Sequence, residues 1–367
     1  MRTIIRKKLE MSKFYPLQVD EVTRETDDCV SVSFDIPTQF KNEFSFIPGQ
    51  YLVLETSIQG EKVRRSYSLC SSPNEDQWRV AIKKVPEGKF STYANEGLKK
   101  GDTIDVMPPD GNFKLETSKN NANTYVAYAA GSGITPVLSM IKTVMDDEPD
   151  SKFMLFYGNR TTESIIFRNE IENLKNIYMD RMTVHHILSK EKLGSPLFFG
   201  RIDSEKAKKF GEVFYTPNDV KGYYICGPSA MIFSIKETLE SQGVSSDNIH
   251  FELFYTDDIP KVQKVEEVTF DPKIESQISI VLDGESFDMP LEYGGKTILD
   301  AALDAGADLP FACKGGVCST CKAKITSGEV EMDLNYALEP DEVKNGFVLT
   351  CQAHPRSSSV TVNFDEA

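Results

Sequence analysis

Long apolar runs are missing from this chain of 367 residues, and none approaches the roughly 18 residues of a membrane span. The first residues, MRTIIRKK, return to charge too soon for the core of a signal peptide, so we expect a cytoplasmic protein with no membrane partner. Positive charge is also scarce. The 41 Lys and Arg side chains stand against 56 Asp and Glu, a formal charge of −15, which argues against nucleic acid as a partner.

A disulfide framework is not expected, because the cysteines number seven and the chain shows no export signal. Cys29, Cys70 and Cys226 stand alone, whereas the other four gather near the C-terminus. The composition, 40% apolar and 26% charged, is that of a globular protein, and the length suggests two or three domains. Residues 276–367 carry 15 acidic and 6 basic side chains, so we expect a separate acidic unit that suits a basic protein partner.

Residues 1–118 predict an antiparallel β-barrel. Short alternating or apolar segments recur there between turn residues, and several such strands in succession are typical of an antiparallel barrel or sandwich. The clearest strands are Val30–Phe34, Tyr51–Leu54, Trp78–Ile82 and Thr103–Val106.

Residues 119–258 predict an α/β domain with a parallel sheet, because apolar strands alternate with segments of helical periodicity. The expected strands are Tyr125–Ala130, Phe153–Tyr157 and Tyr223–Cys226, and the expected helices are Pro136–Met145, Glu163–Leu174 and Pro228–Gln242.

Residues 259–276 are polar and read as a linker, and residues 277–367 predict a small α+β domain. Its expected elements are a hairpin of Ile278–Leu282 and Ser286–Met289 across Asp283-Gly284, and a helix over Thr297–Ala305 ended by Gly306.

The four C-terminal cysteines have the most specific spacing in the chain: Cys313-x4-Cys318-x2-Cys321, then 29 residues, then Cys351. This is the plant-type spacing for a 2Fe–2S cluster. Gly315 and Gly316 allow the loop to curl so that backbone N–H groups face the sulfurs. A zinc site and buried free thiols are the alternatives, but zinc usually takes two close pairs of cysteines, and only one such pair exists here. The segment 278–367 therefore resembles a plant-type ferredoxin domain, a β-grasp fold with these cysteines as metal ligands.

Two further segments combine charged, aromatic and hydroxyl side chains: Arg65-Ser66-Tyr67-Ser68 after an apolar strand, and Gly88-Lys89-Phe90-Ser91-Thr92 at a helix start. An arginine can pair with a phosphate, a tyrosine can cover a ring, a serine can bond the flavin N5 edge, and a helix start can bind a pyrophosphate. An exposed strand end and a helix capped by Ser91 or Thr92 are the structural alternatives. In this order the segments resemble the flavin motifs of the ferredoxin–NADP reductase superfamily, which implies FAD, with FMN as the alternative.

Two strand-to-helix turns resemble the nicotinamide motifs of the same superfamily: Ala130-Gly131-Ser132-Gly133-Ile134-Thr135-Pro136 and Cys226-Gly227-Pro228. The first is G-x-G-x-x-P and not the G-x-G-x-x-G fingerprint, yet its glycines let a phosphate approach a helix N-terminus in a similar way. The resemblance implies that Thr135 and Cys226 lie beside the nicotinamide. A small buried side chain is the structural alternative for Cys226.

Arg160 follows the second expected strand of the α/β domain, where the superfamily reads the adenosine ribose. A guanidinium there can hold a 2′-phosphate, whereas an acidic residue favours NADH. We expect NADPH as the bound nucleotide, with NADH as the alternative. For Arg160 itself, the alternative is a solvated side chain at a strand end without a ligand. Near the end of this domain, the resemblance implies that Glu252 is a proton-handling group and that Phe254 lies beside the flavin ring. The alternative is that this segment is only the last strand of the sheet. His185 and His186 lie in a strand-like run, and no metal role is expected for them.

The domain order resembles the one-chain oxygenase reductases, with those of the ring-1,2-phenylacetyl-CoA epoxidase type, in phenylacetate catabolism, most similar in pattern. The resemblance implies an oxidoreductase that takes a hydride from NADPH onto FAD and passes single electrons through the cluster to an oxygenase or ferredoxin-like acceptor. Ser68, Cys226 and Glu252 are the expected catalytic residues. The reductase of a Rieske or steroid hydroxylase is the alternative within this class, and a non-catalytic iron–sulfur sensor or carrier is the alternative outside it.

Overall fold

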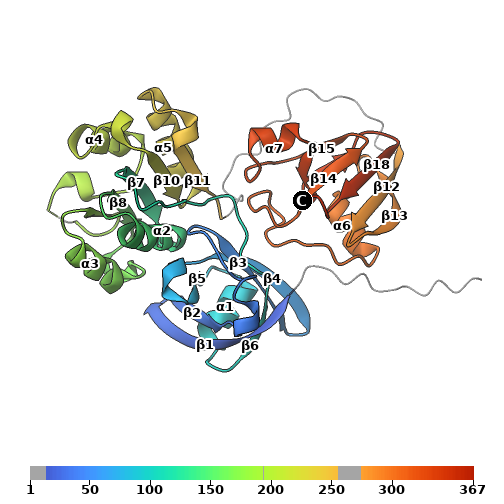
Figure 1. Ribbon diagram of the computed structural model, residues 1–367, viewed down its shortest axis with the longest axis horizontal. Helices are drawn as coiled ribbons and strands as arrows, with labels where there is room; N and C mark the ends of the chain where they lie inside the picture. Colours follow the sequence, from blue (N-terminus) through green and yellow to red (C-terminus); the bar gives the residue numbers. More distant parts are fainter. Residues whose placement is uncertain (1–13, 193, 255–273) are drawn as a thin grey trace, which may run out of the picture. The chain divides into compact units, whose positions relative to one another are not determined.

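The computed structural model describes residues 14–192, 194–254 and 274–367. They belong to two compact units, one spanning Tyr15–Ile259 and the other containing residues 274–367 (Figure 1). The expected linker, 259–276, lies outside the described residues except at its end, where Glu275 and Ser276 already belong to a strand. None of the helices in the described ranges combines the length and hydropathy that a membrane crossing needs.

The first part of the first unit is an antiparallel barrel with one helix. Its elements are β1 (Tyr15–Thr26), β2 (Cys29–Asp35), β3 (Tyr51–Ile58), β4 (Glu61–Ser68), β5 (Trp78–Lys83), α1 (Lys89–Glu96) and β6 (Thr103–Val106). The six strands are arranged in the order β4-β3-β6-β1-β2-β5. Leu69, directly after β4, forms an antiparallel bridge with Val80 of β5, which joins the two ends of the sheet. The expected barrel and its four named strands are confirmed.

The second part of this unit is a parallel sheet between helices. Its elements are β7 (Thr124–Ala130), α2 (Ile134–Asp147), β8 (Lys152–Asn159), α3 (Arg168–Ile177), β9 (Met182–Leu188), α4 (Ser204–Val213), β10 (Gly222–Cys226), α5 (Ser229–Ser241) and β11 (Ile249–Glu252). The strand order is β11-β10-β7-β8-β9, and all neighbours are parallel. Helices α2 and α3 cover one face and α4 and α5 the other (Figure 1). The expected α/β fold is confirmed.

One expected helix, Glu163–Leu174, is wrong in its first half. The chain makes only a 3-10 turn at Thr162–Ser164, and α3 begins at Arg168. Phe167 has φ of +60°, a left-handed conformation that an α-helix cannot contain. The apolar run that suggested a helix is buried as an irregular segment, with the guanidinium of Arg79 5.1 Å from the centre of the Phe167 ring.

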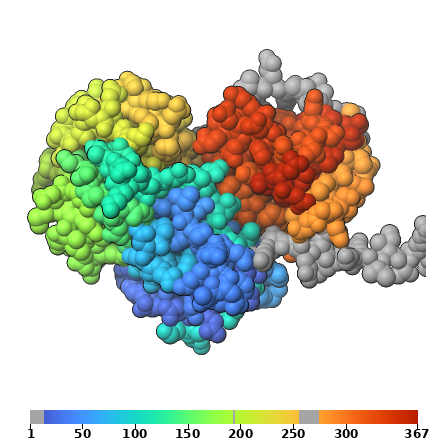
Figure 2. Space-filling model, in the orientation of Figure 1, coloured from blue at the N-terminus to red at the C-terminus, as the bar shows by residue number. Residues whose placement is uncertain are grey.

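Polar contacts join the barrel to the α/β part of the same unit. Arg79 Nη2 of β5 donates to both carboxylate oxygens of Glu170 in α3, at 2.7 and 2.8 Å. The buried ammonium of Lys142 in α2 pairs with Glu170 and, at 2.7 Å, with Glu75 before β5. The surfaces of the two parts, blue and green, meet without a gap (Figure 2). These contacts fix the position of the flavin-like motifs relative to the nucleotide-like motifs.

The second unit is a small α+β domain, as expected. Its elements are β12 (Glu275–Leu282), β13 (Glu285–Glu292), α6 (Ile298–Asp304), β14 (Lys322–Ser327), β15 (Val330–Met332), α7 (Pro340–Lys344), β16 (Phe347–Leu349), β17 (Ala353–Pro355) and β18 (Ser359–Asn363). The main sheet has the order β13-β12-β18-β14-β16, with β12 and β18 parallel and the other pairs antiparallel. Positive φ at Asp283 and Gly284 forms the tight turn expected for the hairpin.

Candidate functional site

The two expected nicotinamide turns lie side by side at the carboxyl ends of neighbouring strands. β7 and β10 are parallel partners, and the strand order reverses around β7, which is where ligands bind in open parallel sheets. A Cβ atom on Gly133 would lie 2.1 Å from the carbonyl oxygen of Cys226 and 2.9 Å from the nitrogen of Gly227. Only glycine therefore allows the start of α2 to approach β10 this closely.

The other side chains of the first turn shape its backbone. Gly131 has φ of +55°, and its carbonyl accepts a hydrogen bond from Tyr157 Oη at 2.9 Å. Thr135 is buried and donates from Oγ1 to the carbonyl of Ser132 at 2.9 Å. Pro136 is buried as well, whereas Gly131 and Ser132 are partly exposed. A ligand can therefore reach the 131–132 backbone directly, and Thr135 and Pro136 hold the turn.

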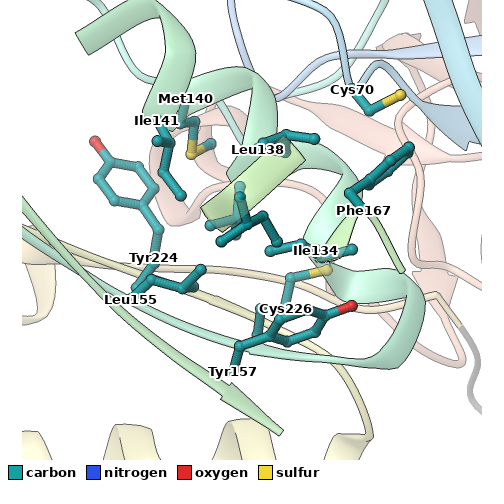
Figure 3. Close-up of a cluster of buried hydrophobic side chains, with 14 of the residues drawn as sticks. Cys70, Ile134, Leu138, Met140, Ile141, Leu155, Tyr157, Phe167, Tyr224 and Cys226 are labelled. Atoms are coloured by element: carbon teal, nitrogen blue, oxygen red, sulfur yellow. The ribbon is translucent and has the colours of Figure 1, made fainter. Parts of the chain in front are cut away.

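Cys226 lies in the core beside Tyr157 and Ile134 of α2 (Figure 3). Its side chain is fully buried, and burial raises the pKa of the thiol well above its ordinary value. The thiol therefore stays protonated and behaves as a small apolar side chain. Its position brings the next strand into the site, because Cys226 of β10 is the register partner of Glu252 of β11.

The three expected catalytic residues are brought together across the two parts of the unit. Ser68 Oγ, at the end of β4, donates a hydrogen bond to Glu252 Oε2 at 3.1 Å. Withdrawal from water raises the pKa of Glu252 to about 8, and the bond from Ser68 acts in the opposite direction. Glu252 therefore holds a proton at neutral pH. Phe254, two residues further on, packs partly buried against the core of the α/β part.

The first flavin-like motif presents its side chains from β4. Arg65 is exposed, Ser66 and Tyr67 are partly exposed, and Ser68 is buried. The Tyr67 ring lies 5.6 Å, centre to centre, from the buried ring of Phe90 in α1. That contact brings both flavin-like motifs together, so their guanidinium, aromatic ring and hydroxyl groups fit a bound flavin.

Strand alternation separates Arg65 from its neighbour Arg64. Arg64 is buried and pairs with Glu55 of β3, so its charge is already balanced inside the barrel. The Arg65 guanidinium, by contrast, is exposed and donates from Nη1 to the carbonyl of Arg64 at 2.6 Å. Of the two arginines, Arg65 is the one that a phosphate can reach.

The second flavin-like motif forms the start of α1, with Gly88 as the N-cap residue. The alternative of Ser91 or Thr92 as the cap is therefore wrong. Ser91 is buried, and its hydroxyl accepts from Val85 N and donates to Gly88 O, both at 3.2 Å. Lys89 is exposed and Thr92 partly exposed. The backbone N–H groups of this first turn suit a phosphate.

Arg160 is exposed directly after β8, which fits both a residue that meets the adenosine end of a nucleotide and a solvated arginine. The structure also brings an acidic side chain to this loop. Glu191, which follows β9, accepts hydrogen bonds from Thr162 N at 2.7 Å and from Thr162 Oγ1 at 2.8 Å. Sequence reasoning missed Glu191 because it follows the neighbouring parallel strand and lies 29 residues away from Thr162.

His185 and His186 belong to β9 and serve packing. The His185 ring stacks on Phe198 and Phe156, and burial lowers its pKa to about 4. His186 Nε2 lies 3.2 Å from Glu172 Oε1 of α3.

The four C-terminal cysteines converge in the second unit, three from the loop between α6 and β14 and one from the turn after β16. Cys313 is partly exposed, and the other three are buried. The sulfurs form two pairs. Cys318 Sγ lies 3.0 Å from Cys313 Sγ, and the Cys321 thiol donates a hydrogen bond to the sulfur of Cys351. No three His, Cys, Asp or Glu side chains in the described ranges form a group that could hold a single ion. Two pairs are the arrangement that two irons with two thiolates each require.

The loop around Cys313 favours the thiolate form that a metal ligand needs. The hydrogen bond from Cys318, together with the backbone N–H groups of Gly315, Val317 and Cys318, lowers the pKa of the Cys313 thiol to about 6. Gly316 has φ of +72°, but the other left-handed residue is Lys314, with φ of +53°, and not Gly315 as the sequence suggested. The curl thus includes a non-glycine residue.

Three family models match the chain in the order of its parts. They are the oxidoreductase FAD-binding domain over residues 16–115, the oxidoreductase NAD-binding domain over residues 128–237, and the 2Fe-2S iron-sulfur cluster binding domain over residues 280–356. The expected FAD, pyridine nucleotide and 2Fe–2S cluster are thereby confirmed as cofactor classes.

The chain resembles reductase components over nearly its whole length. It is 42% identical to a component of the 1,2-phenylacetyl-CoA epoxidase of Escherichia coli K12 over 97% of this chain and 99% of that one. It is 31% identical to the ferredoxin reductase component of 3-ketosteroid-9-alpha-monooxygenase of Rhodococcus rhodochrous, over 95% and 96%. Phthalate dioxygenase reductase shares the fold, with a TM-score of 0.56 at 23% identity over 96% of this chain and 98% of that one. This chain belongs to the family of NAD(P)H-dependent oxygenase reductases that carry FAD-binding, NAD-binding and 2Fe–2S domains on one polypeptide.

Proposed function

We propose that this chain is the reductase component of a phenylacetyl-CoA epoxidase and that NADPH is its electron donor. The main support for this proposal is the 42% identity to the E. coli epoxidase component across 97% of the chain, which includes all three domains. The steroid monooxygenase reductase is 31% identical over a similar span, so the epoxidase is favoured over a steroid hydroxylase as the system served. The partners are then the oxygenase subunits of that epoxidase, in the cytoplasm, where thiolate ligands stay reduced.

The residues have distinct parts in this proposal. When bound, FAD accepts electrons in pairs and releases them singly, and the cluster carries one at a time. Arg65 and the start of α1 bind the flavin phosphates, and Tyr67 covers the ring. The turns at Gly131–Gly133 and Cys226–Gly227 bind the nicotinamide end of NADPH. Ser68 and Glu252 hold a proton where the two ligands meet, supported by their 3.1 Å hydrogen bond.

The test is reconstitution of the purified holoprotein with the oxygenase subunits of a phenylacetyl-CoA epoxidase. NADPH oxidation coupled to consumption of phenylacetyl-CoA is the expected result. The same holoprotein with the oxygenase component of a steroid hydroxylase is the comparison. Faster coupling to the steroid component would contradict the epoxidase assignment.

A variant separates the cluster from the flavin. Cys318→Ser removes one of four thiols and should abolish cluster-dependent reduction of cytochrome c, while NADPH-dependent reduction of ferricyanide through the flavin stays largely intact. A flavin-loaded wild-type protein that reduces neither acceptor would instead favour a non-catalytic iron–sulfur sensor or carrier.

A further inference from the structure

Gln352 directly follows Cys351, and both its backbone N–H and its backbone carbonyl are hydrogen-bonded. Its N–H donates to the carbonyl of Leu349 at 2.9 Å, and its own carbonyl accepts from Asp333 N at 2.9 Å. The residue lies between β16 and β17 and is only 9% exposed. Its side chain is therefore held beside the three-cysteine loop.

The amide nitrogen of Gln352 faces three acceptors. Nε2 lies 3.0 Å from the carbonyl oxygen of Lys314, 2.9 Å from that of Cys351 and 3.7 Å from Cys351 Sγ. The opposite orientation of the amide would place its oxygen against two carbonyl oxygens and a sulfur, with no hydrogen to share. The chemistry of the neighbours thus fixes Nε2, with its two N–H groups, on the side of the two carbonyls and the sulfur.

The same side chain supports the loop that carries the other cysteines. Its bond to the Lys314 carbonyl holds a residue whose φ of +53° is unfavourable for a side chain other than glycine. A Cβ on Gly316 would lie 3.2 Å from Gln352 Cγ, so the glycine lets the loop lie close against the glutamine. Gln352 therefore connects the isolated fourth cysteine to the loop of the first three.

We propose that Gln352 is a positioning residue of the 2Fe–2S cluster. Its amide donates a hydrogen bond to the sulfur of Cys351 and thereby raises the reduction potential of the cluster. The inference rests on Cys351 as a cluster ligand. Reduction adds negative charge to the cluster and its sulfurs, and an N–H dipole aimed at a sulfur stabilises the more negative state. Because a glutamine amide does not titrate, this contribution is independent of pH.

The first experiment is a redox titration of the holoprotein followed by the EPR signal of the reduced cluster. Gln352→Met keeps the length of the side chain and removes the donor. At a fixed solution potential, the ratio of reduced to oxidised cluster should fall about tenfold, which is 59 mV for one electron. Gln352→Lys restores a donor and should not fall below the wild type. Gln277→Met, on an exposed position of β12, is the matched control and should leave the ratio unchanged. An unchanged ratio in Gln352→Met with an assembled cluster would overturn the inference.

A second experiment does not require Gln352→Met to assemble a cluster. Gln277 and Gln352 are the only glutamines of residues 274–367, so 15N labelling of glutamine side chains in the wild type marks both. A labelled side-chain nitrogen coupled to the reduced cluster in electron–nuclear spectra, and retained in Gln277→Met, is the expected result. A reduced cluster without that coupling would refute the role of Gln352. A wild type with no cluster signal at all would overturn the proposed function, and this inference with it.

Discussion

Ser68 Oγ donates a hydrogen bond to Glu252 Oε2 at 3.1 Å, although the two residues are 184 positions apart in the chain. Ser68 ends a strand of the barrel, and Glu252 ends the edge strand of the parallel sheet, paired in register with Cys226. The contact therefore joins the flavin-like and the nucleotide-like parts at one proton-holding carboxyl group. Because the pKa of Glu252 is raised to about 8, this carboxyl is mostly neutral at pH 7.

Replacement of Glu252 should change the pH dependence of flavin reduction by NADPH. In the wild type, Glu252 holds its proton below pH about 8 and loses it above, so the rate of flavin reduction should change near that pH. Glu252→Gln should lack this transition. Ser68→Ala should move it to higher pH, because the lost hydrogen bond favours the ionised carboxylate. Rapid-mixing absorbance measurements across about pH 6 to 9.5 give the profile. Glu205→Gln, on an exposed residue of α4, is the control and should keep the transition. A transition that persists in Glu252→Gln would contradict the role of this carboxyl.

Local patterns in the sequence predicted most of the fold but not the contacts between distant segments. Alternation of apolar and polar residues predicted β6 at its observed bounds, Thr103–Val106. The cysteine spacing alone predicted that Cys313 and Cys351 lie in one site. The helix expected over Glu163–Leu174 failed because periodicity cannot show that Phe167 is left-handed and packs under Arg79 from the barrel. The approach of Glu191 to the Arg160 loop is of the same kind, since it depends on which strands are neighbours in the sheet.

Gly133→Ala should weaken NADPH binding and hydride transfer. The added Cβ would lie 2.1 Å from the carbonyl oxygen and 2.5 Å from the carbonyl carbon of Cys226, and these backbone atoms leave it no room. The two nicotinamide turns must therefore move apart, and kcat/KM for NADPH should fall by roughly tenfold to a hundredfold. Steady-state ferricyanide reduction measures this, with flavin absorbance to show that FAD is retained. Gly97→Ala, whose Cβ would meet its nearest atom at 3.4 Å, is the control. An unchanged kcat/KM in Gly133→Ala would mean that the turns do not bind the nucleotide.

Arg160→Ala should reduce the preference for NADPH over NADH. The exposed guanidinium after β8 is free to meet a 2′-phosphate, and loss of a charged hydrogen bond typically costs a factor of about ten or more in affinity. KM for NADPH should rise by that factor while KM for NADH stays the same. Lys208→Ala, on an exposed residue of α4, removes a positive charge elsewhere and should affect neither. Equal changes for both nucleotides in Arg160→Ala would assign the residue to a part of the ligand that NADH and NADPH share.

Glu170→Gln should destabilise the first unit, because Arg79 and the buried Lys142 share this carboxylate. Burial alone would raise the pKa of Glu170, but the two cations outweigh it, and its pKa lies below the ordinary 4.5. The stabilisation is therefore complete above pH 4.5 and is lost as the pH falls through the folded-state value. At pH 7 we expect a loss of about 2 kcal/mol, smaller than for a fully buried pair, and a fall in Tm of roughly 4–8 °C. Thermal unfolding followed by flavin release measures it. Glu172→Gln on the same helix is the control, and an equal effect from both variants would contradict the network.

Electron delivery to the oxygenase should weaken as salt is added, because the second unit is strongly acidic. Residues 276–367 carry 15 Asp and Glu against 6 Lys and Arg, and the Asp341 side chain, for one, is 87% exposed. Opposite charge on a partner steers such a surface into contact, and salt screens that attraction beyond about 10 Å at 0.1 M. Raising the salt from about 0.05 to 0.5 M should lower the coupled rate several-fold at limiting oxygenase concentration. Ferricyanide reduction by the same protein, which needs no docking between proteins, should change much less. A coupled rate that ignores salt would show that the excess acidic charge of this unit does not guide docking.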